Sequence, residues 1–249
     1  MPSSVENLLV DIGNSQIKWA ISAGDSWRVG SPIENRGDKS DLSLWQDLSR
    51  PAGVFISNSA GQSCYPAVAD WCMSHWEVVP MVLQSRAEQS GVRNGYADAS
   101  SLGVDRWLAL IAAHHAFKGA LAVVDCGTAI TVDALLEEGD FLGGVISAGP
   151  QISMTALTSK ATHLSSGEMH YSSVFNTNTR EALTSGALVF AAGGIERVLD
   201  EFEARLGPDF KVLVTGGFAH TIAALIRRPT EVYPDLVLEG IRIAISQRS

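Results

Sequence analysis

The sequence lacks most features that mark secreted, membrane-bound or zinc-dependent proteins. Its three cysteines form no Cys-x-x-Cys pair and its six histidines form no His-Glu-x-x-His motif. Neither a disulfide framework nor a zinc site is therefore indicated. No apolar run reaches the length of about 18 residues that a membrane span needs. The N-terminus also has no basic segment followed by an apolar one, as a signal peptide would. These absences predict a cytoplasmic protein with no membrane partner.

Basic residues are scarce as well. Lys and Arg number 18 against 27 Asp and Glu, which gives a formal net charge of −9 at pH 7. A general nucleic-acid-binding protein normally carries a basic face, so no nucleic-acid partner is expected. With 46% hydrophobic and 18% charged residues, the chain should form a globular protein with a sizeable core. Its length allows one large domain or two of about 120 residues.

The common nucleotide-binding and hydrolase motifs are missing. No Gly-Lys dipeptide occurs, which excludes a Walker A loop, and no two glycines stand two positions apart. The second absence excludes both the dinucleotide-binding Gly-x-Gly-x-x-Gly motif and the glycine loop of protein kinases. A Gly-x-Ser-x-Gly nucleophile motif is absent too. Any phosphate-binding chemistry must therefore use another type of loop.

Two similar stretches are present instead, at residues 8–21 (LLVDIGNSQIKWAI) and 122–135 (AVVDCGTAITVDAL). Each has an apolar run, an Asp-x-Gly turn with hydroxyl or amide side chains, and a second apolar run. This pattern predicts a strand, a tight turn and a returning strand, with glycine allowing close backbone approach. Ordinary hairpins would give the same pattern. As a pair, the two turns suit a phosphate and its counter-cation, and their separation by nearly half the chain indicates a duplicated unit.

Apolar periodicity elsewhere indicates strands that alternate with helices, which is typical of an α/β protein. The predicted strands include residues 8–11, 16–22, 54–57, 78–83, 141–150 and 211–215, with a further strand within 24–50. The predicted helices are residues 42–48, 65–75, 103–115, 151–161, 178–206 and 219–227, and a last helix follows residue 235. Residues 91–96 and 162–178 are expected to be loops.

The helix at residues 103–115 starts with Gly-Val-Asp-Arg. Asp105 in its first turn complements the helix dipole, whereas the cationic Arg106 is mildly disfavoured there. The position of Arg106 therefore suggests that it faces a ligand. Lys18 lies close enough to the first Asp-x-Gly turn for its ammonium group to reach back to it.

Together these motifs resemble those of type III pantothenate kinases, which belong to the superfamily of acetate and sugar kinases, Hsp70 and actin. The matching segments are Asp11-Ile12-Gly13-Asn14-Ser15 with Lys18, Gly103-Val104-Asp105-Arg106, Asp125-Cys126-Gly127-Thr128-Ala129 with Thr131 and Asp133, Gly143-Gly144, Asn178-Thr179 and Thr215-Gly216-Gly217. The resemblance implies an α/β fold of two similar ribonuclease-H-like (actin-like ATPase) halves, each a mixed sheet flanked by helices. We expect these halves at residues 1–118 and 119–249.

The resemblance also implies roles for individual residues. The first phosphate loop, which binds ATP, comprises Asp11, Ile12, Gly13, Asn14, Ser15, Gln16, Ile17 and Lys18, and Asp11 serves the Mg²⁺ of the nucleotide. Thr128 contacts the nucleotide phosphates, and Asp125 binds a monovalent cation, potassium or ammonium. The pantothenate site comprises Tyr96, Gly103, Val104, Asp105, Arg106 and Thr179.

The chemistry of the substrate agrees with these roles. The primary hydroxyl of pantothenate is a poor nucleophile at neutral pH, and the Asp105 carboxylate can accept its proton. The guanidinium group of Arg106 suits the substrate carboxylate because it can bind it in a bidentate manner. Two positions depart from the family pattern. Ser15 stands for the more usual Thr, a mild change that keeps the hydroxyl. Ala148-Gly149 replaces Pro-Gly, a change expected to affect the geometry of that loop but not the reacting groups.

The predicted function is the ATP-dependent phosphorylation of pantothenate to 4′-phosphopantothenate, the first step of coenzyme A biosynthesis, by a homodimeric kinase. Two alternatives stay open. One is another activity of the same superfamily, a sugar or acid kinase or a phosphatase, and the other is a regulatory accessory factor with reduced catalysis. Intact Asp11, Asp105 and Asp125 favour a working enzyme.

Overall fold

The computed structural model describes residues 5–24, 26–160 and 168–246, and the chain divides into two compact units. Unit 1 comprises Met1–Ser90, Tyr96–Ala112 and Leu236–Ser249. Unit 2 comprises Gly91–Gly95 and Ala113–Asp235. The C-terminal helix thus belongs to the unit that contains the N-terminal strands. The division into halves at residue 118 stays a prediction.

Unit 1 is built on a mixed sheet with the strand order β3-β2-β1-β5-β6, and β4 pairs with β2. β1 is antiparallel to β2 and parallel to β5, and β5 is parallel to β6. The bounds are β1 (Glu6–Ile12), β2 (Gln16–Ala23), β3 (Ser26–Val29), β4 (Ile33–Glu34), β5 (Gly53–Asn58) and β6 (Met81–Val82), with β7 (Glu88–Gln89) further along the chain.

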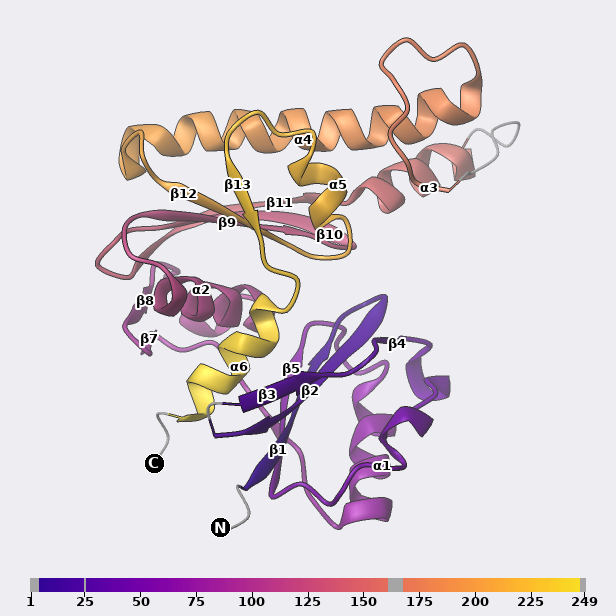
Figure 1. The fold of residues 1–249 in the computed structure, drawn as a ribbon, viewed down its shortest axis with the longest axis vertical. Helices are drawn as coiled ribbons and strands as arrows, with labels where there is room; N and C mark the ends of the chain where they lie inside the picture. Colours follow the sequence, from indigo (N-terminus) through magenta and orange to yellow (C-terminus); the bar gives the residue numbers. More distant parts are fainter. Residues whose placement is uncertain (1–4, 25, 161–167, 247–249) are drawn as a thin grey trace. The chain divides into compact units, whose positions relative to one another are not determined.

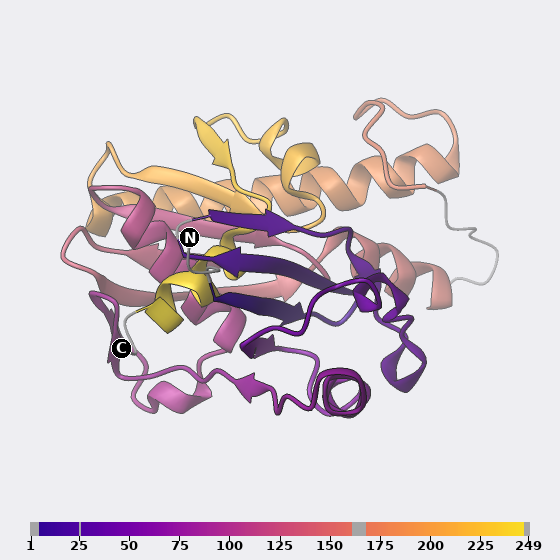
Figure 2. The ribbon, with the colours of Figure 1, turned by 60° about the horizontal axis from the view of Figure 1, so that its bottom comes forward.

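Helices cover both faces of this sheet (Figures 1 and 2). Because side chains alternate between the faces of a strand, Leu8, Val10 and Ile12 pack into one core cluster with helix α1 (Tyr65–Trp76). The opposite face, which carries Leu9, packs against helix α6 (Leu236–Ser246). Unit 1 also contains the 3₁₀ turns η1 (Gly37–Lys39), η2 (Ser43–Trp45) and η3 (Ala99–Ser101) and most of helix α2 (Val104–Ala116).

The sheet of unit 2 has the order β13-β12-β9-β10-β11-β8. β9, β10 and β11 are antiparallel neighbours, whereas β12 is parallel to both β9 and β13. The bounds are β8 (Val92–Asn94), β9 (Leu121–Cys126), β10 (Ala129–Leu135), β11 (Asp140–Ala148), β12 (Lys211–Thr215) and β13 (Thr230–Val232). Helices α4 (Thr179–Leu206) and α5 (Ala219–Ala223) pack on this sheet, and α3 (Pro150–Lys160) packs against α4 (Figure 1).

The two units repeat one strand arrangement. The order β3-β2-β1-β5-β6 in unit 1 matches β11-β10-β9-β12-β13 in unit 2, with the same parallel and antiparallel neighbours. The predicted α/β fold of two ribonuclease-H-like halves is therefore confirmed. The two Asp-x-Gly turns are equivalent positions in this repeat, since each one joins the first and second strands of its sheet.

Some local predictions were wrong. The helix expected at residues 42–48 is only the 3₁₀ turn η2, in which Trp45 is fully buried and stacks on Trp76. The loop expected at 91–96 contains β8, because Val92 is buried and Asn94 pairs with Phe141 of β11. The strand at 78–83 shortens to β6. The helix at 219–227 shortens to α5, which ends at Ala223. Residues 161–167, part of a predicted helix end and loop, lie outside the described residues.

Within the described residues, helix α4 alone is long and apolar enough to cross a membrane by length and composition. This is weak evidence, since a core helix of a water-soluble protein passes the same test. Leu188, Ala192 and Ile195 of α4 belong to the buried core cluster of unit 2.

Candidate functional site

The first Asp-x-Gly turn joins β1 to β2 in unit 1 and is held by backbone and amide contacts. The backbone N–H of Gly13 donates to the carbonyl of Gln16 at 3.0 Å, which closes the turn. Asn35 supports it from outside, because its side-chain amide donates to the carbonyl of Gly13 at 2.7 Å and its backbone N–H donates to that of Ser15. Asn14, Ser15 and Gln16 are exposed. Their polar groups are therefore accessible to a ligand.

A polar row crosses the sheet beside this turn. Asp11 on β1 is in register with Lys18 on β2 and with Ser57 on β5. Residues in register on neighbouring strands project from the same face of a sheet. Asp11 and Lys18, predicted for Mg²⁺ and phosphate, are thus brought together. Local sequence does not predict Ser57 as a member of this row, because only the pairing of β5 with β1 places it beside Asp11.

The start of helix α2, also in unit 1, brings three predicted residues together. Arg106 is buried, and its Nη1 donates to the Tyr96 hydroxyl oxygen at 2.9 Å. The Arg106 guanidinium carbon lies 5.7 Å from the centre of the Tyr96 ring. Asp105 is partly exposed, and its Oδ1 accepts from the backbone N–H of Arg106 at 2.8 Å. A Cβ atom at Gly103 would lie 2.7 Å from that oxygen, so glycine leaves room for the carboxylate.

The second Asp-x-Gly turn, in unit 2, packs against two segments that contain glycine, one at Gly149 and one at Gly216-Gly217. The backbone N–H of Gly149 donates to the Thr128 carbonyl at 2.9 Å, and that of Phe218 donates to the Cys126 carbonyl. A Cβ atom at Gly216, where φ is +92°, would lie 2.4 Å from Oδ1 of Asp125. The Asp125 carboxylate therefore lies directly against the backbone of the Gly216-Gly217 turn.

Cys126 and Thr179 are two further residues of interest in unit 2. Burial, and then the negative charge of Asp125, raise the pKa of the Cys126 thiol to about 12, so this thiol is not a nucleophile. Thr179 is the exposed first residue of helix α4. The helix is capped by Asn178, whose side-chain oxygen accepts from the backbone N–H of Glu181 at 3.0 Å. The Thr179 hydroxyl is therefore not needed as the cap.

The residues present fit the ions that the resemblance implies. Within the described ranges no three or more His, Cys, Asp or Glu side chains gather as a metal site, so a protein-only metal cage is not indicated. Mg²⁺ commonly binds through one or two carboxylates plus substrate phosphates, and Asp11 beside the buried Ser57 hydroxyl supplies oxygen atoms of this kind. The Asp125 carboxylate, packed against the backbone near Gly127 and Gly216, is the charged oxygen donor at the position that the resemblance assigns to a monovalent cation.

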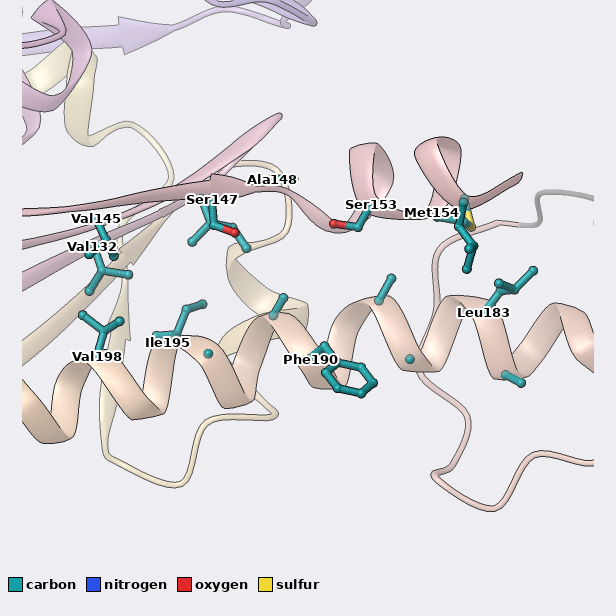
Figure 3. Close-up of a pocket in the computed structure, with 17 residues that line it drawn as sticks. Val132, Val145, Ser147, Ala148, Ser153, Met154, Leu183, Phe190, Ile195 and Val198 are labelled. Atoms are coloured by element: carbon teal, nitrogen blue, oxygen red, sulfur yellow. The ribbon is translucent and has the colours of Figure 1, made fainter. Parts of the chain in front are cut away.

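A separate apolar groove of about 640 Å³ lies in unit 2 between α4, α3 and the strands β10 and β11 (Figure 3). Leu183, Phe190, Ile195 and Val198 line it from α4, Val132 and Val145 from the strands, and Met154 from α3. Phe190 is 84% exposed. Exposed apolar patches of this kind often mark interaction surfaces.

Comparisons with known proteins identify one family. The sequence model of a protein family described as type III pantothenate kinase matches residues 7–201. A type III pantothenate kinase of Nitrosococcus oceani is 35% identical, over 94% of this chain and 91% of that protein. One from Nitrosomonas eutropha is 37% identical, over 95% and 93%.

Solved structures show the same fold at low sequence identity. A Campylobacter jejuni protein, whose name assigns it to the Baf family of transcriptional activators, has a TM-score of 0.54 at 20% identity over 96% of this chain and 98% of that one. A ROK family protein from Streptococcus pneumoniae, solved with sucrose, has a TM-score of 0.51 at 13% identity over 97% and 98%.

Proposed function

Because the chain belongs to the type III pantothenate kinase family, we propose that it transfers the γ-phosphoryl group of ATP to pantothenate. The product is 4′-phosphopantothenate, and the reaction opens coenzyme A biosynthesis. The observation that carries the proposal is the cluster at the start of α2, where a partly exposed carboxylate, Asp105, adjoins a buried arginine that binds Tyr96. A general base next to a carboxylate-binding group matches a substrate that carries a hydroxyl and a carboxylate.

The transfer itself needs one proton acceptor and a well-placed set of positive charges. As the substrate hydroxyl oxygen bonds to the γ-phosphorus, the bond from that phosphorus to the bridging oxygen of ADP breaks, and Asp105 takes the hydroxyl proton. Arg106 holds the substrate carboxylate through its guanidinium group, while Tyr96 and Thr179 line the pantothenate site. Positioning and charge neutralisation supply most of the catalysis in such transfers.

The first turn, residues 11–18, binds the nucleotide phosphates through its backbone N–H groups and Lys18. Asp11 holds the divalent cation of the nucleotide, which neutralises phosphate charge when bound. Thr128 adds a phosphate contact from the second turn, and Asp125 binds a monovalent cation, potassium or ammonium. The acidic net charge of the chain makes these cations necessary, because a triphosphate would otherwise meet repulsion.

The enzyme acts as a cytoplasmic homodimer in this proposal. The apolar groove of unit 2 supports a second copy of the chain as partner, because a large exposed aromatic residue, Phe190, lies beside a hollow lined by apolar side chains. Closed two-fold dimers use one patch twice, so a patch with both a protrusion and a hollow can pair with itself.

Purified protein should consume ATP only when pantothenate and either potassium or ammonium are present, and mass spectrometry should detect a phosphorylated pantothenate. The matched control replaces potassium with sodium at equal ionic strength. A panel of sugars, small carboxylic acids and polyphosphate tests the alternative activities of the superfamily. Folded protein that turns over one of these acceptors but not pantothenate would contradict the proposal.

A further inference from the structure

Ser57 contains a buried hydroxyl group that the fold does not use. The residue is fully buried on β5, and its Oγ makes no hydrogen bond among the residues that the structure describes. A buried polar group without a partner costs about 1–3 kcal/mol of stability. Such groups are rare in native proteins, and a role in catalysis or in binding an ion or water is one of the usual reasons.

The position of this hydroxyl connects it with the proposed nucleotide site. Ser57 is in register with Asp11, whereas its neighbour Ile56 projects from the opposite face into the core cluster that packs on α1. Ser57 and Asp11 therefore share the face of the sheet that also carries Lys18. The row Lys18–Asp11–Ser57 places an ammonium, a carboxylate and a hydroxyl group on three adjacent strands.

The backbone around Ser57 is held on both sides. The N–H of Ser59 donates to the Ile12 carbonyl at 3.0 Å, and the N–H of Leu83 donates to the Ile56 carbonyl at 2.8 Å. β5 is an interior strand between β1 and β6. A side chain fixed on an interior strand keeps its orientation better than one on a loop, as a precise binding role requires.

Unit 2 contains a residue at the position equivalent to Ser57. Asp125, the equivalent of Asp11, is in register with Thr215 on β12, the equivalent of β5. Thr215 is also buried, but its Oγ1 donates to the Pro234 carbonyl at 3.4 Å. A hydroxyl beside the aspartate thus occurs in both units, and in unit 2 a carbonyl of the fold accepts from it. In unit 1, no residue that the structure describes makes a hydrogen bond to the hydroxyl of Ser57.

We propose that Ser57 is a positioning residue whose hydroxyl hydrogen-bonds to the water shell of the nucleotide's divalent cation beside Asp11. This inference rests on the proposed function, since it assumes that Asp11 serves this cation. Mg²⁺ usually retains several waters, and a hydroxyl group can both donate to and accept from water. Outer partners of this kind typically contribute about 10–100-fold to metal affinity or activity.

The test compares Ser57→Ala with Ser22→Ala, a buried serine on β2 of the same sheet. Mn²⁺ binding to the complex of protein and ADP is measured by electron paramagnetic resonance, and thermal unfolding is measured without nucleotide. Ser57→Ala should weaken Mn²⁺ binding about 10-fold and should leave the unfolding temperature unchanged or raised. Ser22→Ala should leave Mn²⁺ binding at the wild-type value. Ser57→Thr, which keeps the hydroxyl, should restore most of the affinity.

Equal Mn²⁺ binding by Ser57→Ala and Ser22→Ala would overturn the inference. So would a Ser57→Ala protein that unfolds earlier and binds ADP more weakly even without Mn²⁺, because the hydroxyl would then be structural. These measurements use no pantothenate. If pantothenate is not phosphorylated but Mn²⁺ binding depends on Ser57, the proposed function fails and the role of Ser57 stands.

Discussion

At the scale of single residues, the proposed site contains side chains at positions that local structure does not favour. Arg106 is the clearest case, because a buried arginine in the first turn of a helix is unfavourable next to the helix dipole. Its contact with the Tyr96 hydroxyl explains how it is accommodated. The position of Arg106 in the sequence suggested that it faces a ligand, and the roles of these residues stay predictions that mutation can test.

Asp105→Asn should abolish turnover while it leaves the protein folded. The amide keeps the shape of the side chain but cannot accept the proton of the substrate hydroxyl, and loss of a general base costs about 10²–10⁴-fold in rate. The measurement is kcat with saturating ATP and pantothenate, beside a thermal unfolding curve. Asp70→Asn, an exposed position on α1, is the matched control. A variant with near-normal kcat would exclude Asp105 as the base.

His114 should make the protein less stable at acidic pH. Burial, and then the charge of His115, lower the pKa of His114 below its ordinary value of 6.5. The folded state therefore binds this proton less readily than the unfolded state, and the free energy of unfolding decreases as the pH falls through about 6.5. Above that pH both states are neutral at this residue and the effect vanishes.

Urea unfolding of His114→Asn at pH near 7.5 and near 5 tests the direction of this pH dependence. The variant should lose less stability between the two pH values than the wild type does. His220→Asn replaces an exposed histidine on α5 and serves as the control. An unchanged loss of stability in His114→Asn would show that other groups cause the acid sensitivity.

At the scale of elements, the sequence predicted local features well and long-range pairing poorly. The two hairpins with Asp11 and Asp125 were recognisable because strand pattern and turn residues lie within about fourteen positions. The β8 strand was missed because its partner, β11, lies far along the chain, and only their pairing makes Val92 a strand residue. Ser57 was missed for the same reason, since nothing local to β5 points to Asp11.

Gly149→Ala should displace the second Asp-x-Gly turn and destabilise the protein. A Cβ atom there would lie 2.4 Å from the Gly127 carbonyl oxygen and 2.5 Å from that of Thr128, and both are backbone atoms that cannot rotate away. Overpacking of this kind typically costs about 1–3 kcal/mol. We expect a lower free energy of unfolding in urea and a raised KM for ATP, because Thr128 belongs to the displaced turn.

Gly193→Ala on helix α4 is the matched control with the opposite expected sign. Among the described atoms, none lies within 4 Å of a Cβ atom built at this exposed position. Alanine should therefore stabilise the helix by about 0.5–1 kcal/mol. If Gly149→Ala is as stable as wild type while Gly193→Ala is stabilised, the second turn has more freedom than its contacts indicate.

At the scale of the whole molecule, the two units repeat one strand order but place different residues beside their equivalent aspartates. The units share strand order, yet Asp11 is in register with a lysine and a serine, whereas Asp125 is in register with two threonines, Thr131 and Thr215. One row carries a positive charge and suits phosphate with a divalent cation. The other carries none on its strands and suits a carboxylate-bound monovalent cation. Equivalent positions of a repeat can thus serve different ions.

In the proposed homodimer, the two copies meet through the apolar groove of unit 2. Phe190→Glu should convert the proposed dimer to a monomer, because a charge placed in the apolar groove cannot be buried without a partner. Size-exclusion chromatography with light scattering gives the mass directly, and sedimentation over a range of concentrations gives the dissociation constant. Val79→Glu, also at a strongly exposed apolar position but in unit 1, should leave the mass unchanged.

Phe190→Glu also tests whether dimerisation affects catalysis. If residues of a partner subunit complete the pantothenate site, Phe190→Glu should raise the KM for pantothenate more than the KM for ATP, and activity should recover as the protein concentration rises. If the wild type is itself a monomer, the homodimer is wrong. If Phe190→Glu stays a dimer, the copies associate through a different surface and the groove is not the dimer interface.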